Sequence, residues 1–268
     1  MSNIELIKAP DSAHVHALHP SPNIEPRKPG YRPDLLLLHY TGMQCVEKAI
    51  DWLARPESKV SCHYVVAEDG TITQMVSEQM RAWHAGQSFW KGSTDINSCS
   101  IGIEIHNPGH DQGYPNFPDI QMDAVTRLAA DIVARHAIAT ERVLAHSDVA
   151  PHRKTDPGEK FDWHGLAQAG VGRWITPEPT RADDWSLGQG ARSEKVAEAQ
   201  HLLRAYGYGI DVTGTLDEPT TFVVRAFQLH WRPACIDSRL DGSTLATIRR
   251  LAGTPTPKTT GHSDAFTA

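Results

Sequence analysis

The chain has 268 residues, of which 40% are hydrophobic and 22% are charged, and its formal net charge at pH 7 is −6. This length allows one large domain, or a medium domain with a small one. The negative charge gives no electrostatic reason to expect a nucleic acid as partner, and no stretch approaches the roughly 20 apolar residues that a membrane-spanning helix needs.

Composition also bears on compartment and on metal binding. Residues 1–20 contain no basic segment followed by an apolar one, so we expect a cytoplasmic protein, or a periplasmic or exported one if a leader has been removed. The cysteines are far apart and form no C-x-x-C pair, which favours buried free thiols over disulfides. The unusual count is that of histidine, 15, which directs attention to metal sites.

The first part of the chain alternates between polar and apolar segments. Residues 1–33 are rich in proline, histidine and serine, so we expect an arm over the main domain or a partly mobile lead-in. Residues 34–42 (DLLLLHYTG) are typical of a strand buried on both faces. His39 lies near the end of this strand, where it is either a functional ligand or a core histidine bonded to backbone. Helical spacing follows in residues 44–54.

A hairpin, a loop and a strand are predicted next. Residues 62–76 predict the hairpin, and His63 at its start is interpreted as structural, or as a residue behind a metal ligand, and not as a ligand itself. Residues 81–92 (RAWHAGQSFWKG) place aromatic rings between glycines, either in the core or on a loop that forms the apolar wall of a ligand groove. Residues 100–107 (SIGIEIHN) alternate with period two. A carboxylate in so apolar a strand is costly, so Glu104 is either a general base or a member of a buried ion pair.

The longest amphipathic helix is predicted over residues 119–137, with its apolar stripe at Ile120, Ala124, Leu128, Ile132 and His136. A short strand then leads into residues 146–158 (HSDVAPHRKTDPG), which the prolines stiffen. This segment gathers His146, Lys154 and Asp156. Two ligands here, with one more histidine from elsewhere, would make a three-ligand zinc site with an open fourth position. We take His39 as the third ligand and Glu104 as the general base.

The C-terminal part has a different character. Residues 174–189 predict an interdomain linker. Residues 190–253 predict three helices, with Ser193 and Asp217 as N-caps of the first two, which is near the lower size limit for an independent core. Residues 254–268 have little apolar content and predict a disordered tail. The fold class expected is therefore α/β, with a mixed central β-sheet flanked by helices and a small C-terminal three-helix domain.

Five stretches in a fixed order carry a family resemblance: HYTG, SCHYVV, RAWHAG, SIGIEIHN and HSDVAPHRKTDPG. Together they resemble the AmpD- and AmiD-like, type 2 family of zinc-dependent N-acetylmuramoyl-L-alanine amidases, over about residues 30–173, so we place the amidase domain at residues 34–173. The resemblance implies one zinc ion per chain, with these ligands: His39, His146 and Asp156. It implies Glu104 as the catalytic carboxylate and Lys154 as its cationic partner. It also implies three residues that line the substrate groove: Trp83, His84 and Asn107.

The C-terminal helices resemble a peptidoglycan-binding three-helix domain. The expected activity is hydrolysis of the amide between the lactyl group of N-acetylmuramic (or 1,6-anhydro-N-acetylmuramic) acid and L-alanine, with peptidoglycan or anhydro-muropeptides as substrate. This would serve cell-wall recycling or turnover. Removal of residues 190–268 is expected to spare hydrolysis of soluble fragments and weaken association with polymeric wall. The alternative is a recognition module that binds peptidoglycan without cutting it.

Overall fold

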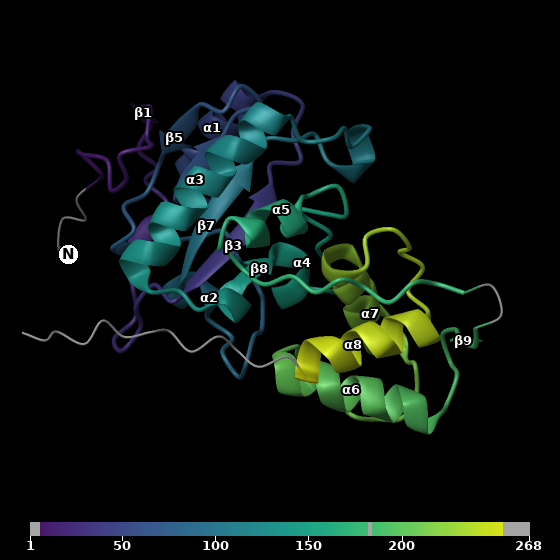
Figure 1. The fold of residues 1–268 in the computed structure, drawn as a ribbon. Helices are drawn as coiled ribbons and strands as arrows, with labels where there is room; N and C mark the ends of the chain where they lie inside the picture. The colour runs from purple at the N-terminus through teal and green to yellow at the C-terminus, as the bar shows by residue number, and fades with distance from the viewer. Residues whose placement is uncertain (1–5, 182–183, 254–268) are drawn as a thin grey trace, which may run out of the picture.

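A mixed sheet forms the centre of the computed structural model, which describes residues 6–181 and 184–253 (Figure 1). The strand order is β1-β5-β4-β7-β3-β8. The strands are β1 Ala17–Leu18, β3 Leu35–Tyr40, β4 Tyr64–Val66, β5 Ile72–Gln74, β7 Ser100–Ile105 and β8 Val143–Ala145. Strands β4, β7, β3 and β8 run parallel to one another, whereas β5 is antiparallel to β4. The expected α/β fold with a mixed sheet is confirmed.

The two faces of the sheet pack against different helices. Side chains of Leu36 and Leu38 in β3 pack with those of helix α3, Asp119–His136, and of α5, Trp163–Gln168. Because side chains alternate along a strand, Leu35 and Leu37 point to the opposite face, where they enter a second cluster with the short helix α4, His146–Val149. His39 continues this second row, which brings it to the face that α4 covers.

One expectation about α3 is wrong. Ile120, placed in its apolar stripe, is 57% exposed, whereas Gln121 is buried. The Gln121 side-chain amide donates hydrogen bonds to the carbonyl oxygens of Val66 and His106 at distances of 3.1 and 2.8 Å. These acceptors at the ends of β4 and β7 stabilise a polar residue in the first turn, so that turn presents Gln121 to the sheet.

Shorter elements complete this part of the chain. The residues expected as an arm supply the edge strand β1, and strand β2, which pairs antiparallel with β6. These elements are β2 Ile24–Pro26, β6 Met80–Ala82, α1 Val46–Leu53, α2 Ile96–Cys99, and the 3₁₀ helices η1 Pro56–Ser58, η2 His110–Gln112 and η3 Thr140–Arg142. All four cysteines are free, and Cys62 and Cys99 are buried, whereas Cys45 and Cys235 are only partly so.

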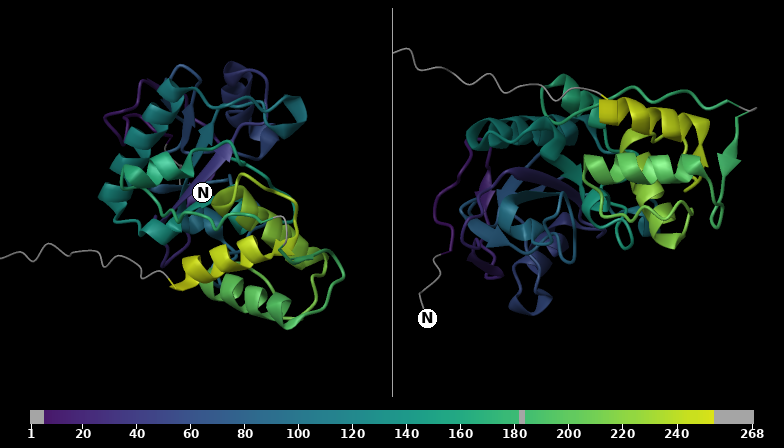
Figure 2. Two further views of the ribbon diagram at one scale, coloured as in Figure 1. Left: turned by 45° about the vertical axis from the view of Figure 1, so that its right-hand side comes forward. Right: turned by 90° about the horizontal axis from the view of Figure 1, so that it is seen from below.

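Three helices form the C-terminal unit, which lies beside the sheet (Figure 2). The Ser193 side chain accepts from the backbone N–H of Lys195, and that of Asp217 accepts from Thr220, so both predicted N-caps are confirmed. The helices are α6 Glu194–Tyr206, α7 Glu218–Trp231 and α8 Gly242–Gly253, and a two-stranded ladder joins β9 Ser186–Leu187 to β10 Leu240–Asp241. The expected disordered tail lies outside the described residues.

The C-terminal unit shares a hydrophobic core with the sheet. One buried cluster contains Leu35 and Trp90 from the first part of the chain together with Phe227 and Trp231 of α7. Ile175, which the sequence placed in a linker, is buried in the same cluster. The start of the expected linker is therefore packed into the core that the two parts share.

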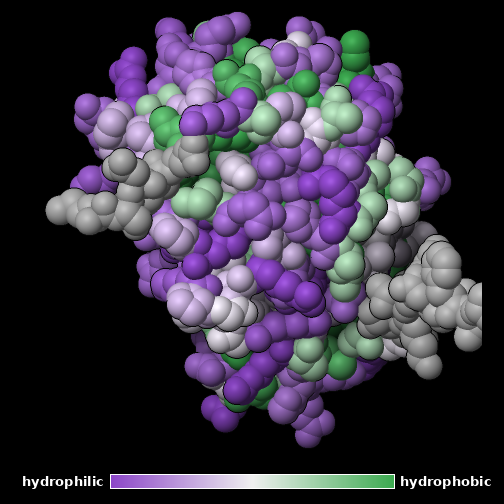
Figure 3. Space-filling model, turned by 90° about the vertical axis from the view of Figure 1, so that its left-hand side faces the viewer, coloured by the Kyte–Doolittle hydropathy of each residue, from purple (hydrophilic) through white to green (hydrophobic). Residues whose placement is uncertain are grey.

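The molecular surface is mainly hydrophilic on the face shown in Figure 3, where hydrophobic residues form small separate groups. Among the described residues, the exposed large hydrophobic side chains are those of Leu6, Tyr31, Trp52, Val60 and Ile120. Within residues 6–181 and 184–253, no helix combines the length and apolar character needed to cross a membrane.

Candidate active site

Three parallel strands end at one edge of the sheet and bring the candidate site residues together. His39 in β3 lies directly opposite Glu104 in β7. His146 follows β8, which pairs with the other side of β3. Carboxyl ends of neighbouring parallel strands meet at one edge, which is where α/β proteins commonly place their sites.

Asp156 reaches the same edge from the loop after α4. The Ser147 N–H donates to the main-chain oxygen of Asp156 at 3.0 Å and holds the loop against α4. Asp156 Oδ2 lies 3.2 Å from His39 Nδ1 and 3.0 Å from His146 Nδ1, and the two nitrogens are 2.8 Å apart. The side chains of all three residues are buried. The cluster of donors expected from the sequence is therefore present in the fold.

The orientation of the His146 ring follows from its second nitrogen. His146 Nε2 lies 3.1 Å from the carbonyl oxygen of Ala85, which can only accept a hydrogen bond. Nε2 therefore carries the hydrogen, and in the neutral ring Nδ1 presents a lone pair. A metal-binding histidine is commonly oriented in this way, with its other nitrogen bonded to a carbonyl or carboxylate.

A chain of hydrogen bonds orients His39 in the same way. Ser100 Oγ donates to the Ile96 carbonyl at 2.6 Å, so it accepts from His84 Nε2 at 3.2 Å. His84 Nδ1 is then an acceptor for His39 Nε2 at 3.0 Å. This leaves Nδ1 of His39 with a lone pair that faces His146 and Asp156.

Three lone-pair donors thus converge on one point, which is unfavourable unless a cation lies among them. Burial and the neighbouring His146 lower the pKa of His39 to about 4, so this ring is neutral at pH 7. Two neutral imidazoles and a carboxylate are a common donor set for a divalent metal ion, and their atoms are close enough to hold one.

A cavity of about 260 Å³ opens beside these donors, and both predicted catalytic side chains line it. Burial, and then the charge of Asp156, raise the pKa of Glu104 well above its usual value. Glu104 Oε2 is buried without a hydrogen-bond partner, and no salt bridge joins Glu104 to another described residue. This arrangement favours the acid–base interpretation of Glu104 over the buried ion pair. Lys154 is half-buried in the same wall.

The three residues expected to line a substrate groove lie in different environments. Trp83 is half-buried at the cavity, and its indole nitrogen has no partner in the described chain. His84 also borders the cavity, but its ring nitrogens are used by His39 and Ser100, which makes it an orienting residue. Asn107 is 2% exposed and bonds within its own loop, to Pro115 and Gly109, away from the cavity lining. The structure gives no support to a substrate contact by Asn107.

His63, interpreted from the sequence as structural, is bonded to backbone on both sides. Its Nδ1 accepts from the Gly102 N–H at 2.9 Å, and its Nε2 lies 3.1 Å from the Met80 carbonyl. The structural interpretation is confirmed.

Sequence reasoning missed two apolar residues that line the cavity. Trp52 of α1 and Val60 line it, although they are 45% and 37% exposed. The signal was available for Trp52, because this residue lies off the apolar stripe of α1, which contains Ala49 and Leu53. A large aromatic ring on the outer face of a helix suggests a binding surface.

Two family profiles match the chain. That of N-acetylmuramoyl-L-alanine amidase matches residues 29–159, and that of a peptidoglycan binding domain matches residues 192–248. The site described above lies in the first match, and α6 and α7 lie in the second.

Relatives and solved structures agree with these matches. The N-acetylmuramoyl-L-alanine amidase AmiD of Escherichia coli is 36% identical over 82% of this chain and 82% of its own length. The structure of AmiD in complex with anhydro-N-acetylmuramic acid-L-Ala-D-γ-Glu-L-Lys gives a TM-score of 0.70 at 34% identity, covering 84% of this chain and 91% of AmiD. The crystal structure of AmpDh3 from Pseudomonas aeruginosa gives a TM-score of 0.67 at 30% identity, covering 84% of this chain and 93% of AmpDh3. The chain therefore belongs to the N-acetylmuramoyl-L-alanine amidase family.

Proposed function

We propose that this chain hydrolyses the amide between the lactyl group of N-acetylmuramic, or 1,6-anhydro-N-acetylmuramic, acid and L-alanine in peptidoglycan fragments. The observation that carries the proposal is the convergence of His39, His146 and Asp156 beside a cavity that is also lined by Glu104, whose Oε2 is buried without a hydrogen-bond partner. The amidase relatives and the anhydro-muropeptide bound to AmiD support this substrate class.

Zinc is the metal that the donor set fits best. Two imidazoles and one carboxylate are a usual set for catalytic zinc, which keeps one position open. When bound, zinc supplies Lewis-acid chemistry at that open position. Ala85 and His84 keep the two imidazole rings turned so that Nδ1 remains available.

Glu104 and Lys154 supply the remaining chemistry. The Glu104 carboxylate accepts a proton from the attacking water and passes it to the leaving alanine nitrogen, which is general base followed by general acid catalysis. The Lys154 ammonium stabilises the negative charge that develops on the lactyl carbonyl oxygen, a role that typically contributes about 10²- to 10³-fold in rate. Trp83, Trp52 and Val60 form the apolar walls that exclude water and hold the substrate.

The experiment is digestion of anhydromuramyl-tripeptide by the zinc-loaded protein and by Glu104→Gln, with products identified by mass. We expect free tripeptide and anhydromuramic acid from the unchanged protein, and a rate about 10²- to 10⁴-fold lower from Glu104→Gln with the same zinc content. Binding of the muropeptide without release of tripeptide would instead support the recognition-module alternative.

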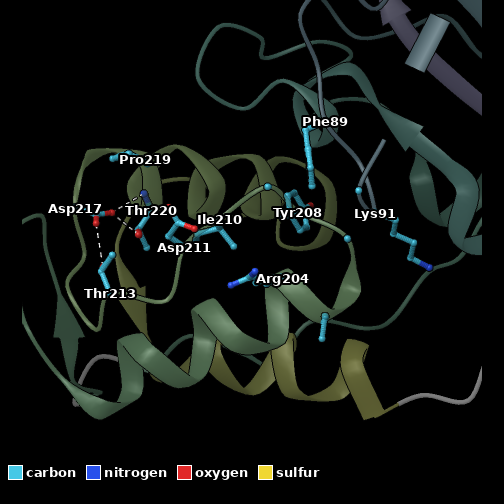
Figure 4. Close-up of a pocket in the computed structure, with 14 residues that line it drawn as sticks. Phe89, Lys91, Arg204, Tyr208, Ile210, Asp211, Thr213, Asp217, Pro219 and Thr220 are labelled. Carbon is cyan, nitrogen blue, oxygen red and sulfur yellow. Dashed lines mark hydrogen bonds between the residues drawn. The ribbon is translucent and has the colours of Figure 1, made fainter. Parts of the chain in front are cut away.

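We also propose that the C-terminal unit retains the enzyme on polymeric peptidoglycan. A cavity of about 750 Å³ lies where the loop of Phe89 and Lys91 meets the C-terminal unit (Figure 4). In this view Arg204 lies between Lys91 and the carboxylate of Asp211. The Lys91 N–H donates to the Gly207 carbonyl at 2.9 Å, which fixes the two parts of the cavity together. Lys91 and Arg204, which line this cavity, are suited to bind the free carboxylates of peptidoglycan stem peptides.

Removal of the two cations tests this site without disturbing the shared core. Lys91→Ala with Arg204→Ala should reduce cosedimentation with purified sacculi and leave hydrolysis of the soluble tripeptide unchanged. The control pair is Arg127→Ala with Arg225→Ala, which removes the same charge at exposed positions outside the cavity. Equal loss of sacculus binding in both pairs would show only a general charge effect and would contradict the site.

A further inference from the structure

A buried carboxylate joins the metal-site helix to the C-terminal unit. Asp148 in α4 is 1% exposed and lies two positions after His146. Its Oδ2 accepts from the Ala145 N–H at 2.9 Å, which closes the turn from which His146 projects. A carboxylate removed from water needs hydrogen-bond donors around it.

Two of those donors come from the C-terminal unit. The Tyr208 hydroxyl donates to Asp148 Oδ1 at 2.5 Å, and His230 Nδ1 donates to Oδ2 at 2.7 Å. The His230 ring is stacked between Trp163 and Trp231, with ring centroids 3.7 and 4.1 Å away. Both donors are themselves buried, at 1% exposure. Asp148 is therefore held in place by the Ala145 N–H together with two groups that the amidase part does not contain.

The same short helix connects to the other ligands. His146 is its first residue, and the Ser147 N–H bonds to the Asp156 main chain. A shift of Asp148 would rotate the turn that sets the His146 ring and loosen the loop that carries Asp156. Metal affinity depends on such outer contacts, because they hold the ligand atoms at the required separations.

We propose that Tyr208 and His230 are positioning residues for the metal site, acting through Asp148 and α4. The proposal rests on the proposed metal-dependent function. It makes the C-terminal unit a part of the catalytic centre, and not only a wall-binding attachment.

The test compares two tyrosine variants in the full chain. Tyr208→Phe removes only the hydroxyl that bonds to Asp148. Tyr206→Phe is the matched control, because the Tyr206 hydroxyl is also buried but has no hydrogen-bond partner in the described chain. We expect Tyr208→Phe to weaken zinc binding about tenfold in a chelator competition and to shift the visible spectrum of the cobalt-substituted protein. Tyr206→Phe should change neither, and the melting temperature of the metal-free forms shows whether each variant folds.

A histidine pair makes the test independent of one variant's folding. In His230→Asn the side-chain amide can still donate a hydrogen bond to Asp148, whereas the side chain in His230→Leu cannot. Both variants lose the stacking of the imidazole ring on the two tryptophans. We therefore expect His230→Asn to bind zinc more tightly than His230→Leu. Unchanged zinc affinity and cobalt spectrum in Tyr208→Phe, with equal affinities in the His230 pair, would overturn the positioning role. An unchanged protein that binds neither zinc nor cobalt would contradict the proposed function itself.

Discussion

Hydrogen bonds behind the two candidate histidine ligands decide which ring nitrogen of each faces Asp156. Ala85 and His84 each occupy Nε2 of one imidazole, so both Nδ1 atoms are available with Asp156. Since burial keeps His39 neutral at pH 7, the site needs no deprotonation of that ring before a metal binds. The donor set is preorganised by the protein, and Asp156 supplies its only negative charge.

Asp156→Ala should therefore lose the metal as well as activity. It removes one of three candidate ligands and leaves two facing lone pairs without a charged partner. Zinc content of the purified variant, measured by atomic absorption, should fall well below one ion per chain. Asp69→Ala, at an exposed turn, is the control. Stoichiometric zinc in inactive Asp156→Ala would exclude it as a ligand.

At the scale of elements, β7 illustrates how a strand makes room for a site. Gly102 is the residue of β7 that faces the His84 ring, and a Cβ added there would lie 2.5 Å from His84 Nδ1. That nitrogen is the acceptor for His39. The absence of a side chain at position 102 thus allows the strand to pack directly against the ring that orients His39.

Gly102→Ala should displace His84 and, through it, His39. The clash is with a buried ring, which has little space to move, so we expect kcat on soluble muropeptide to fall at least about tenfold together with zinc affinity. Gly253→Ala is the control, because a Cβ there meets nothing within 4 Å. Crystal structures or cobalt spectra showing an unmoved His39 in active Gly102→Ala would contradict this argument.

The spacing of apolar residues in the sequence predicts those strands and helices whose apolar residues follow the repeat of the element itself. Apolar runs and alternation were sufficient for β3 and β7, and the 3.6-residue repeat for α3. The exposure of Ile120 was not predictable from the repeat, because the hydrogen bonds of Gln121 to the sheet determine which side of the first turn of α3 is buried. The hydrogen bonds of His84 and the packing of Ile175 depend on residues distant in sequence, which one chain without tertiary contacts does not reveal.

At the scale of the whole molecule, one polar network ties α3 to the segment after β5. Glu78 is buried and bonds to Arg135, His136 and Tyr64. Burial alone would raise the pKa of Glu78, but these hydrogen bonds lower it from 4.5 to about 2. Since the folded pKa is depressed, the stabilisation is complete above pH 4.5 and is lost as the pH falls toward 2.

Urea unfolding between pH 6 and pH 2 should show this loss as a fall of about 3 kcal/mol in the free energy of unfolding attributable to Glu78. Glu78→Gln should be less stable at pH 6, and its stability should depend less on pH in the acid range. The control, Glu57→Gln, alters an exposed carboxylate. Parallel acid curves for Glu78→Gln and the unchanged protein would contradict the assignment.

The shared core changes what truncation should do. A chain that ends at residue 189 would expose Leu35 and Trp90, which pack against Phe227 and Trp231 in one cluster. Exposure of such apolar area favours aggregation and lowers stability. We therefore expect truncation to lower the melting temperature and the hydrolysis of soluble muropeptide, contrary to the expectation for a separable wall-binding domain.

The comparison is the double variant Lys91→Ala with Arg204→Ala, which leaves the core intact. Only this double variant should weaken wall binding without affecting catalysis. A truncated chain with full stability and full activity on the tripeptide would show that the cluster is dispensable.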